Sequence, residues 1–345
     1  MNAIAVHEPV VRSTYPVPQA AGIFSEPAVA SAERHLLALE GLGAATLNEI
    51  LDEAARFRDR WRTEGKAPGI ELRGFEVCNA FFEDSTRTRV SFEIAAQRLG
   101  ATHTTFGVGG SSVSKGESLL DTIHTIAAMG VDLFVIRHPA PGSAAYVARH
   151  LGVGVINGGD GMHEHPTQGL LDLLTLRDAW NGRFEGRRLA IVGDIAHSRV
   201  ARSAIHGLTA LGTEVTLAGP ATLMPADVEL LGVSVAPTLD DAMAGADGVM
   251  ALRLQRERME AGKLPSLPEY TRNWGVNSVR VSTMKPEAVV MHPGPMNRGV
   301  EIAPDAADGP RSRVFGQVEN GVAVRSAVLA RCARAAQTLR TGRAA

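Results

Sequence analysis

Short apolar runs alternate with amphipathic helical stretches from Leu36 onward, and this alternation restricts the fold of the chain more than any other feature. In the first half, residues 75–82 and 131–136 are typical of buried strands. Residues 91–99 and 169–179 carry the spacing of amphipathic helices. The first half is therefore predicted to contain strands and helices in turn.

The same cycle restarts beyond Gly182. Strand-like runs recur between helical stretches at residues 188–192, 214–217 and 248–252. Because such alternation predicts parallel sheets with helices on both faces, we expect an α/β protein of two doubly wound domains, each with a central parallel sheet. The length of 345 residues agrees, since it exceeds what one hydrophobic core usually organises.

Composition and charge restrict the class of protein. Apolar residues make up 45% of the chain and charged residues 21%, as in water-soluble globular proteins. The formal net charge of -2 gives no support to a nucleic-acid or membrane-surface partner, which usually requires a strongly basic face. With only Cys78 and Cys332, the chain has neither a disulfide framework nor a cysteine-rich metal site. No uncharged apolar run approaches the roughly 18 residues that a membrane span needs.

The first 33 residues differ from the rest. They hold four prolines and no sustained periodicity, which is typical of a mobile arm, and a partner-binding tail is the alternative. The basic start and apolar core of a signal peptide are missing. We therefore expect a cytoplasmic protein with a proline-rich N-terminal arm at residues 1–33.

The run Ser85-Thr86-Arg87-Thr88-Arg89 lies between a predicted strand and a predicted helix. The first turn of a helix has unpaired N–H groups and the positive end of the helix dipole, so it attracts anions. The hydroxyls add donors, and the arginines add planar forks suited to phosphate. A helix cap followed by solvated arginines would give the same run, so the run alone leaves both interpretations open.

Residues 107–116 form a Gly/Ser loop that carries Lys115. Its pattern differs from the P-loop, which requires Gly-Lys-Ser/Thr at a helix start, because Gly116 follows the lysine. A loop that presents Lys115 to an anion and an ordinary surface lysine both remain open at this point.

Polar residues also follow other strands of the first half. Arg137 comes directly after a strand, where the ligands of parallel sheets gather. His163 and His165 flank Glu164 near Asp160, but no third ligand has a recurrent metal spacing, so no metal is predicted. We instead expect His165 and Gln168 to form hydrogen bonds at a helix start.

In the second half, polar residues likewise follow the predicted strands. One glycine, Gly193, follows the strand at 188–192, so the glycine fingerprint of dinucleotide-binding folds is missing. Arg253 again follows a strand, and the turn His292-Pro293-Gly294-Pro295 could offer carbonyl groups to a ligand. Together these residues predict a cleft that holds anionic groups and polarises a carbonyl, without a nucleophile-and-base pair for covalent catalysis.

With these motifs in this order, residues 36–340 resemble the aspartate/ornithine carbamoyltransferase family. The Ser-Thr-Arg-Thr-Arg run, the His-Pro-Thr-Gln run at 165–168 and the late His-Pro-x-Pro turn carry the resemblance. It implies a carbamoyl-phosphate-binding domain at 34–168 plus 319–341 and an aspartate-binding domain at 183–310. It also implies that the helix at 325–340 packs back on the first domain.

The resemblance implies a role for each site residue. Carbamoyl phosphate would be held by Ser85, Thr86, Arg87, Thr88, Ser111, Arg137, His165, Gln168, Gly294 and Pro295. The residues implied in catalysis are Arg87, Thr88, Lys115, Arg137 and His165, and those implied in aspartate binding are Lys115, Arg199, Arg253 and Gln255. No cofactor and no metal are implied.

The implied reaction transfers a carbamoyl group to the α-amine of L-aspartate in pyrimidine biosynthesis. Ornithine is the alternative acceptor, but ornithine enzymes carry a cysteine in the late turn and a Ser-Met-Gly loop, both missing here. Arg253 and Gln255 suit a second carboxylate. The family also implies a homotrimer in which the loop with Ser111 and Lys115 reaches a neighbouring site; association with regulatory or dihydroorotase-like subunits stays open. An oxidoreductase of the dinucleotide-binding fold and a non-catalytic scaffold are the rival classes.

Overall fold

The computed structural model describes residues 32–107, 116–255 and 266–343. Its first half contains a parallel four-stranded sheet in the order β2-β1-β3-β4. The strands are β1 (Glu76–Phe81), β2 (Thr102–Gly107), β3 (Leu133–His138) and β4 (Gly154–Asp160). The second half contains a parallel five-stranded sheet in the order β7-β6-β5-β8-β9. Its strands are β5 (Arg188–Val192), β6 (Glu214–Ala218), β7 (Ser234–Val235), β8 (Gly248–Ala251) and β9 (Val289–Met291).

Both faces of the first sheet are covered. Side chains alternate along a strand, so neighbouring residues of β1 enter different cores. Val77 belongs to the core under helices α1, α2, α5 and α11, whereas Cys78 packs with Ile123 of α3 and Val147 of α4. The covering helices are α1 (Ala44–Thr63), α2 (Thr86–Arg98), α3 (Leu119–Ala127), α4 (Ser143–His150), α5 (Pro166–Ala179) and α11 (Val314–Arg343).

The second sheet is built in the same way. Leu189 of β5 packs with Ile205 of α6 (Arg199–Ala210), and the adjacent Ala190 enters the opposite core with Leu239. The other helices of this half are α7 (Leu239–Met243), α8 (Leu267–Trp274), α9 (Ser278–Ser282) and α10 (Pro304–Ala307). The predicted fold class, two α/β domains with central parallel sheets, is confirmed.

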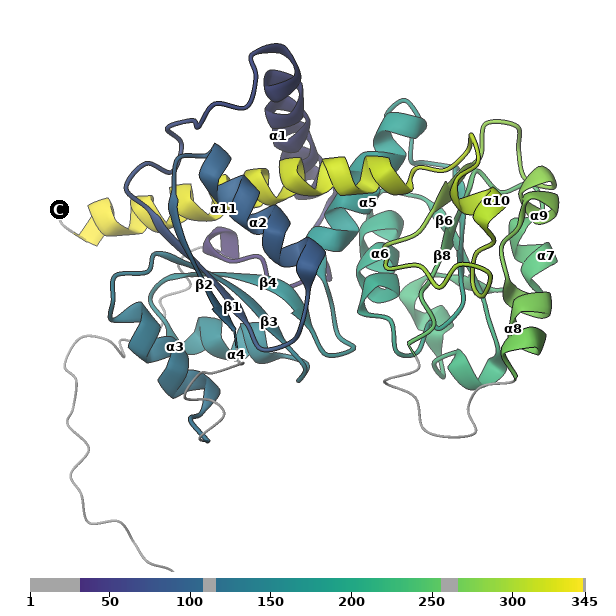
Figure 1. Ribbon diagram of the computed structural model, residues 1–345, viewed down its shortest axis with the longest axis horizontal. Helices are drawn as coiled ribbons and strands as arrows, with labels where there is room; N and C mark the ends of the chain where they lie inside the picture. The colour runs from purple at the N-terminus through teal and green to yellow at the C-terminus, as the bar shows by residue number, and fades with distance from the viewer. Residues whose placement is uncertain (1–31, 108–115, 256–265, 344–345) are drawn as a thin grey trace, which may run out of the picture.

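The C-terminal helix α11, yellow in Figure 1, leaves the second half, crosses α2 and α1 of the first half and packs against both. Its buried residues Val328 and Leu329 share a core with Leu51 of α1 and Phe92 of α2. The helix begins at Val314, so it is longer than the predicted segment at 325–340. Among the described residues, no helix combines the length and apolar composition that a bilayer crossing requires.

Two strands of the first sheet were not predicted. The edge strand β2 reads THTTFG, and none of its residues is buried, so it lacks an apolar face. The strand β4 reads GVINGGD and is buried throughout, but its glycines and asparagine are typical of turns. Arg137 was expected after a strand, whereas the structure places it inside β3, at its carboxyl end.

Candidate functional site

A cavity of about 1060 Å³ lies where the carboxyl ends of the two sheets meet. Parallel strands deliver polar loop residues to this edge, and segments that follow β1, β4, β5, β8 and β9 all contribute to its wall. Twelve of the residues predicted for the site line this one cavity: Ser85, Thr86, Arg87, Thr88, Arg137, His165, Gln168, Arg199, Arg253, Gln255, Gly294 and Pro295. The predicted Ser111 and Lys115 lie outside the described residues.

The start of α2 forms one wall of the cavity. Ser85 occupies the N-cap position, but its side chain makes no capping hydrogen bond in the described chain. A helix cap was the structural alternative for this run, and the observed geometry does not support it. The first turn, from Thr86 to Arg89, therefore presents the positive end of α2 to the cavity through Thr86, Arg87 and Thr88.

Arg87 lies directly against the turn of the second half. Gly294 has a φ of +64°, and a Cβ atom added there would lie 3.1 Å from Arg87 Cζ. The positive φ therefore favours glycine, and a Cβ at this position would crowd the Arg87 guanidinium. Burial, and then the positive charge of Arg253, lower the pKa of Arg87, because guanidinium groups from the two halves line the same cavity. An anion between them would offset their positive charges.

Glu83, which precedes the α2 start, holds two further arginines. Arg137 Nη2 donates to its Oε1 at 2.9 Å, and Arg199 donates to Oε1 and Oε2 at 2.7 and 3.0 Å. Gly159, with a φ of +115°, lets the two guanidinium groups come close, since an added Cβ would lie 3.0 Å from a nitrogen of each. Glu83 thus joins an arginine of the first half to an arginine of the second.

His165 is almost fully buried at the start of α5, where Pro166 follows it as the first helical residue. Its Nε2 lies 3.3 Å from Thr88 Oγ1, and its backbone N–H donates to Ser203 Oγ of α6 at 2.9 Å. Burial, and then the charges of Arg137 and other arginines, lower the pKa of His165 well below its ordinary value. The imidazole is therefore neutral, and it can donate one hydrogen bond while accepting another.

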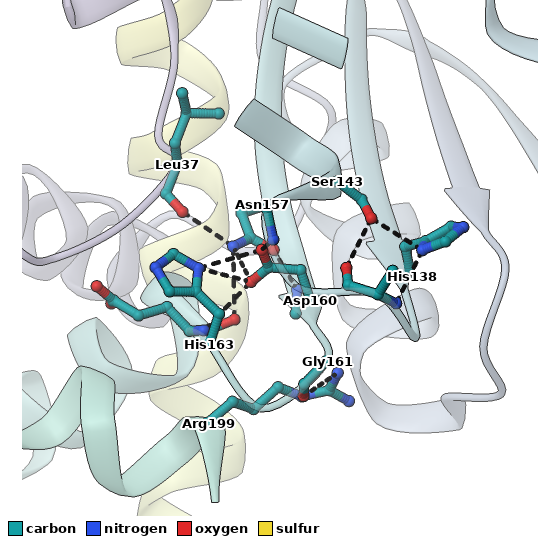
Figure 2. Close-up of polar contacts among 12 residues, drawn as sticks. Leu37, His138, Ser143, Asn157, Asp160, Gly161, His163 and Arg199 are labelled. Carbon is teal, nitrogen blue, oxygen red and sulfur yellow. Dashed lines mark hydrogen bonds and ion pairs between the residues drawn. The ribbon is translucent and has the colours of Figure 1, made fainter. Parts of the chain in front are cut away.

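Asp160 organises the loop between β4 and α5 (Figure 2). Its Oδ1 accepts from Asn157 Nδ2 at 2.7 Å, and its Oδ2 lies 3.1 Å from His163 Nδ1. In the same loop the Gly161 carbonyl accepts a hydrogen bond from Arg199 Nη1 at 3.3 Å. The loop that delivers His165 therefore also contacts the arginine of the second half.

The two histidines of the loop have different surroundings. His163 lies against Asp160, whereas His165 lies against Thr88. Glu40, His163 and Glu164 could bring ligand atoms within 4.8 Å of one another. However, both Glu164 oxygens already accept backbone N–H groups at 2.8 and 3.0 Å, so this carboxylate joins the chain segment before α1 to the start of α5.

Several residues that line the cavity were not predicted. Glu83 and Asp84 directly precede the run Ser85–Arg89 but were assigned no role, and Arg325 and Gln317 belong to α11. Arg325 is buried, with its Cζ 5.3 Å from the Phe92 ring centre, and burial lowers its pKa to about 9. In the sequence it is one arginine among several in an Ala/Arg helix, so no local pattern distinguished it.

The chain matches two adjacent sequence families. The first is described as "Aspartate/ornithine carbamoyltransferase, carbamoyl-P binding domain" and matches residues 34–178. The second is described as "Aspartate/ornithine carbamoyltransferase, Asp/Orn binding domain" and matches residues 185–332. These matches confirm the resemblance noted from the motifs.

Individual proteins with similar sequences belong to the same family. The chain is 54% identical over 306 residues to an aspartate carbamoyltransferase catalytic subunit of Gluconobacter oxydans, covering 88% of this chain and 97% of the relative. It is 53% identical over 297 residues to that of Sorangium cellulosum, covering 86% and 92%. An aspartate transcarbamoylase from Trypanosoma cruzi, solved with carbamoyl phosphate, is similar with a TM-score of 0.78 and 30% identity, covering 88% of this chain and 98% of that one.

Proposed function

Since the chain belongs to the aspartate/ornithine carbamoyltransferase family, we propose that it transfers the carbamoyl group of carbamoyl phosphate to the α-amine of L-aspartate. The products are N-carbamoyl-L-aspartate and phosphate, and the reaction belongs to pyrimidine biosynthesis. The observation that carries the proposal is the single cavity in which Arg87, Arg137, Arg199, Arg253 and Arg325 converge around a neutral His165.

Carbamoyl phosphate binds on the side of the cavity formed by the first half, residues 34–168 plus 319–341. The phosphate group lies at the positive end of α2, where it accepts hydrogen bonds from Ser85, Thr86, Arg87 and Thr88. Ser111 of the neighbouring subunit adds a further hydroxyl donor. Gln168 and the turn at Gly294 and Pro295 hold the carbamoyl amide.

The aspartate carboxylates bind on the side formed by residues 183–310. Arg199 and Arg253 supply planar forks for the two carboxylates, with Gln255 beside them. Lys115 of the neighbouring subunit adds a further cation. Ornithine has an ammonium group where aspartate has its second carboxylate, and that ammonium would be repelled by Arg253. The acceptor is therefore aspartate.

The chemistry requires a polarised carbonyl and a neutral amine. The aspartate nitrogen attacks the carbamoyl carbon, and the carbonyl electron pair moves to oxygen in a tetrahedral intermediate. Arg137, Thr88 and His165 donate hydrogen bonds to that oxyanion, and loss of one such donor typically lowers the rate about 10²–10³-fold. The bond from carbon to the phosphate oxygen then breaks, and the leaving phosphate accepts the amine proton.

Positioning supplies much of the remaining acceleration. Holding two anions in attack geometry replaces a bimolecular encounter by a reaction within one site. Arg199 and Arg253 belong to the second half and Arg87 to the first, so closure of the two halves brings acceptor and donor together and expels water.

In the cell we propose a cytoplasmic homotrimer with active sites shared between subunits, in which Lys115 of one subunit completes the site of its neighbour. Lys115→Ala and His165→Ala proteins are each expected to be inactive. Mixing them with subunit exchange should restore activity, because some sites then receive both native residues. Native mass spectrometry confirms that exchange has occurred, and no recovery after exchange argues against shared sites.

The reaction itself is tested with purified protein, carbamoyl phosphate and either aspartate or ornithine, with chelator present. Carbamoylaspartate should form without added metal, whereas turnover only with ornithine would overturn the assignment. Arg253→Gln is expected to raise the KM for aspartate at least tenfold, which corresponds to about 1.4 kcal/mol, and to change the KM for carbamoyl phosphate much less.

A further inference from the structure

Asp172 is a buried carboxylate beneath the cavity that the proposed reaction does not use. It lies on α5, four residues after Gln168, and only 1% of its surface is exposed. Its Oδ1 accepts from Gln168 Nε2 at 3.0 Å and from Gln317 Nε2 of α11 at 2.7 Å. One carboxylate oxygen therefore holds two side-chain amides from different helices.

This contact determines which end of the Gln168 amide faces the cavity. The Asp172 Oδ1 atom accepts from both amides, so each amide turns its NH₂ group toward Asp172. Gln168 lines the cavity, and its remaining polar atom is the carbonyl oxygen, an acceptor. Asp172 is thus the reason that this position presents an acceptor and not a donor.

The orientation of the Gln317 amide links Asp172 to the turn at residues 292–295 of the second half. Because its Nε2 is held by Asp172, its Oε1 accepts from the His292 backbone N–H at 3.0 Å. His292 Nδ1 in turn accepts from the Gly294 N–H at 2.8 Å. Asp172 is therefore connected to the turn at Gly294 through three hydrogen bonds.

The negative charge of Asp172 is compensated by the nearby Arg325 guanidinium. Burial raises the pKa of Asp172 to about 7, and hydrogen bonds from both amides together with the charge of Arg325 oppose this rise. Arg325 also lines the cavity, so the carboxylate and the cavity share a neighbouring guanidinium group. Removing the negative charge would leave Arg325 buried without this compensation.

We propose that Asp172 is a positioning residue that makes the site selective for a carbamoyl NH₂ group. It orients Gln168 and, through Gln317, the turn at Gly294, so that acceptor oxygens face the amide of the donor. A methyl group in the same place makes no hydrogen bond and leaves those acceptors unsatisfied. The proposal rests on the proposed function, which assigns the amide to Gln168 and this turn.

The test compares carbamoyl phosphate with acetyl phosphate, which carries a methyl group in place of NH₂. Dissociation constants of both compounds are measured by calorimetry for the wild type and for Asp172→Leu, which has a similar volume and no acceptor oxygen. The variant should bind carbamoyl phosphate at least tenfold more weakly and acetyl phosphate less than threefold more weakly, so the preference between them collapses. Equal weakening of both, or no weakening of either, overturns the proposal.

Thr175→Val is the matched control. Thr175 is buried one turn further along α5, accepts a hydrogen bond from Asn320 Nδ2 of α11 at 3.1 Å, and does not line the cavity. The substitution Thr175→Val therefore removes a buried polar contact between the same two helices. The preference for carbamoyl phosphate over acetyl phosphate should stay at the wild-type value. A preference lost equally in this control would show that Asp172 has only a structural role.

Gln317→Met tests the same connection if Asp172→Leu does not fold. It removes the contacts to Asp172 and to the His292 N–H, and we expect at least a threefold loss of preference for carbamoyl phosphate. An unchanged preference for carbamoyl phosphate over acetyl phosphate would overturn the proposal that Asp172 acts through Gln317 on the turn. Formation of carbamoylaspartate by the wild type is measured in parallel, so failure of the proposed function is distinguished from failure of the role of Asp172.

Discussion

The Glu83 carboxylate forms a two-point ion pair with the Arg199 guanidinium, at 2.7 and 3.0 Å, across the boundary between the two halves. Glu83 follows the first strand of the first sheet, and Arg199 begins the first helix of the second half. The same carboxylate also accepts from Arg137. One anion thus orients two of the cations assigned to the substrates.

Glu83→Gln keeps the size of the side chain but removes its charge. Breaking a fully buried ion pair on one side typically costs about 3–5 kcal/mol, and the cost should be smaller here because 23% of the Glu83 side chain is exposed. Arg199 should lose its fixed orientation, so we expect kcat/KM for aspartate to fall about tenfold or more, as steady-state kinetics would measure. An increase in aspartate affinity would show instead that Glu83 competes with the substrate carboxylate.

Gly294→Ala tests the contact between the turn and Arg87. The added Cβ would lie 3.1 Å from Arg87 Cζ, so the guanidinium must shift by a few tenths of an ångström. We expect the KM for carbamoyl phosphate to rise about tenfold, the loss that 1.4 kcal/mol of binding free energy produces.

Gly299→Ala is the control for that substitution. Gly299 also has a positive φ, +81°, but an added Cβ meets no atom within 4 Å. Both variants therefore place alanine at a positive φ, and only Gly294→Ala crowds an arginine. If the two variants raise the KM equally, backbone strain and not the contact with Arg87 is responsible.

His165 should remain neutral throughout the working range of the enzyme. Its pKa lies well below the ordinary value because of burial and the surrounding arginines. Nitrogen NMR of labelled histidine, assigned with His165→Gln, should show no protonation of this ring between about pH 5.5 and 8, a range that brackets the ordinary histidine pKa. A titration near pH 6.5 would contradict the neutral donor in the proposed mechanism.

His35 should make stability depend on pH. Its Nδ1 accepts from the Val155 N–H at 3.1 Å, and burial, followed by the charge of Arg34, lowers its pKa to about 4 from 6.5. Because the folded pKa lies below the unfolded one, the stabilisation is fully present above pH 6.5 and is lost as the pH falls toward 4. The change is at most about 3 kcal/mol.

Urea unfolding at several pH values measures this loss for the wild type and for His35→Gln. Glutamine can accept the same backbone hydrogen bond but does not titrate, so its free energy of unfolding should fall less over this interval. Parallel curves for the two proteins would exclude His35 as the source.

Much of the fold was predictable because its signals are local. The apolar runs at 188–192 and 248–252 predict strands without knowledge of the segments that pack against them, and both strands were observed. The strand β4 was missed because its glycines and asparagine suit turns, and its burial comes from segments distant in sequence. Among described residues, the assigned polar groups reach one cavity because parallel strands direct their following loops to one edge.

The sequence by itself determined the alternation of strands and helices, the order of polar motifs at strand ends and the family. Each of these depends on short segments of consecutive residues. Only the tertiary structure decided which charges meet. Asp172 and Gln317 are 145 positions apart, and Glu83 and Arg199 are 116 apart, yet both pairs form direct hydrogen bonds. The lowered pKa of His165 has the same origin, because burial and nearby charge depend on segments that only folding brings together.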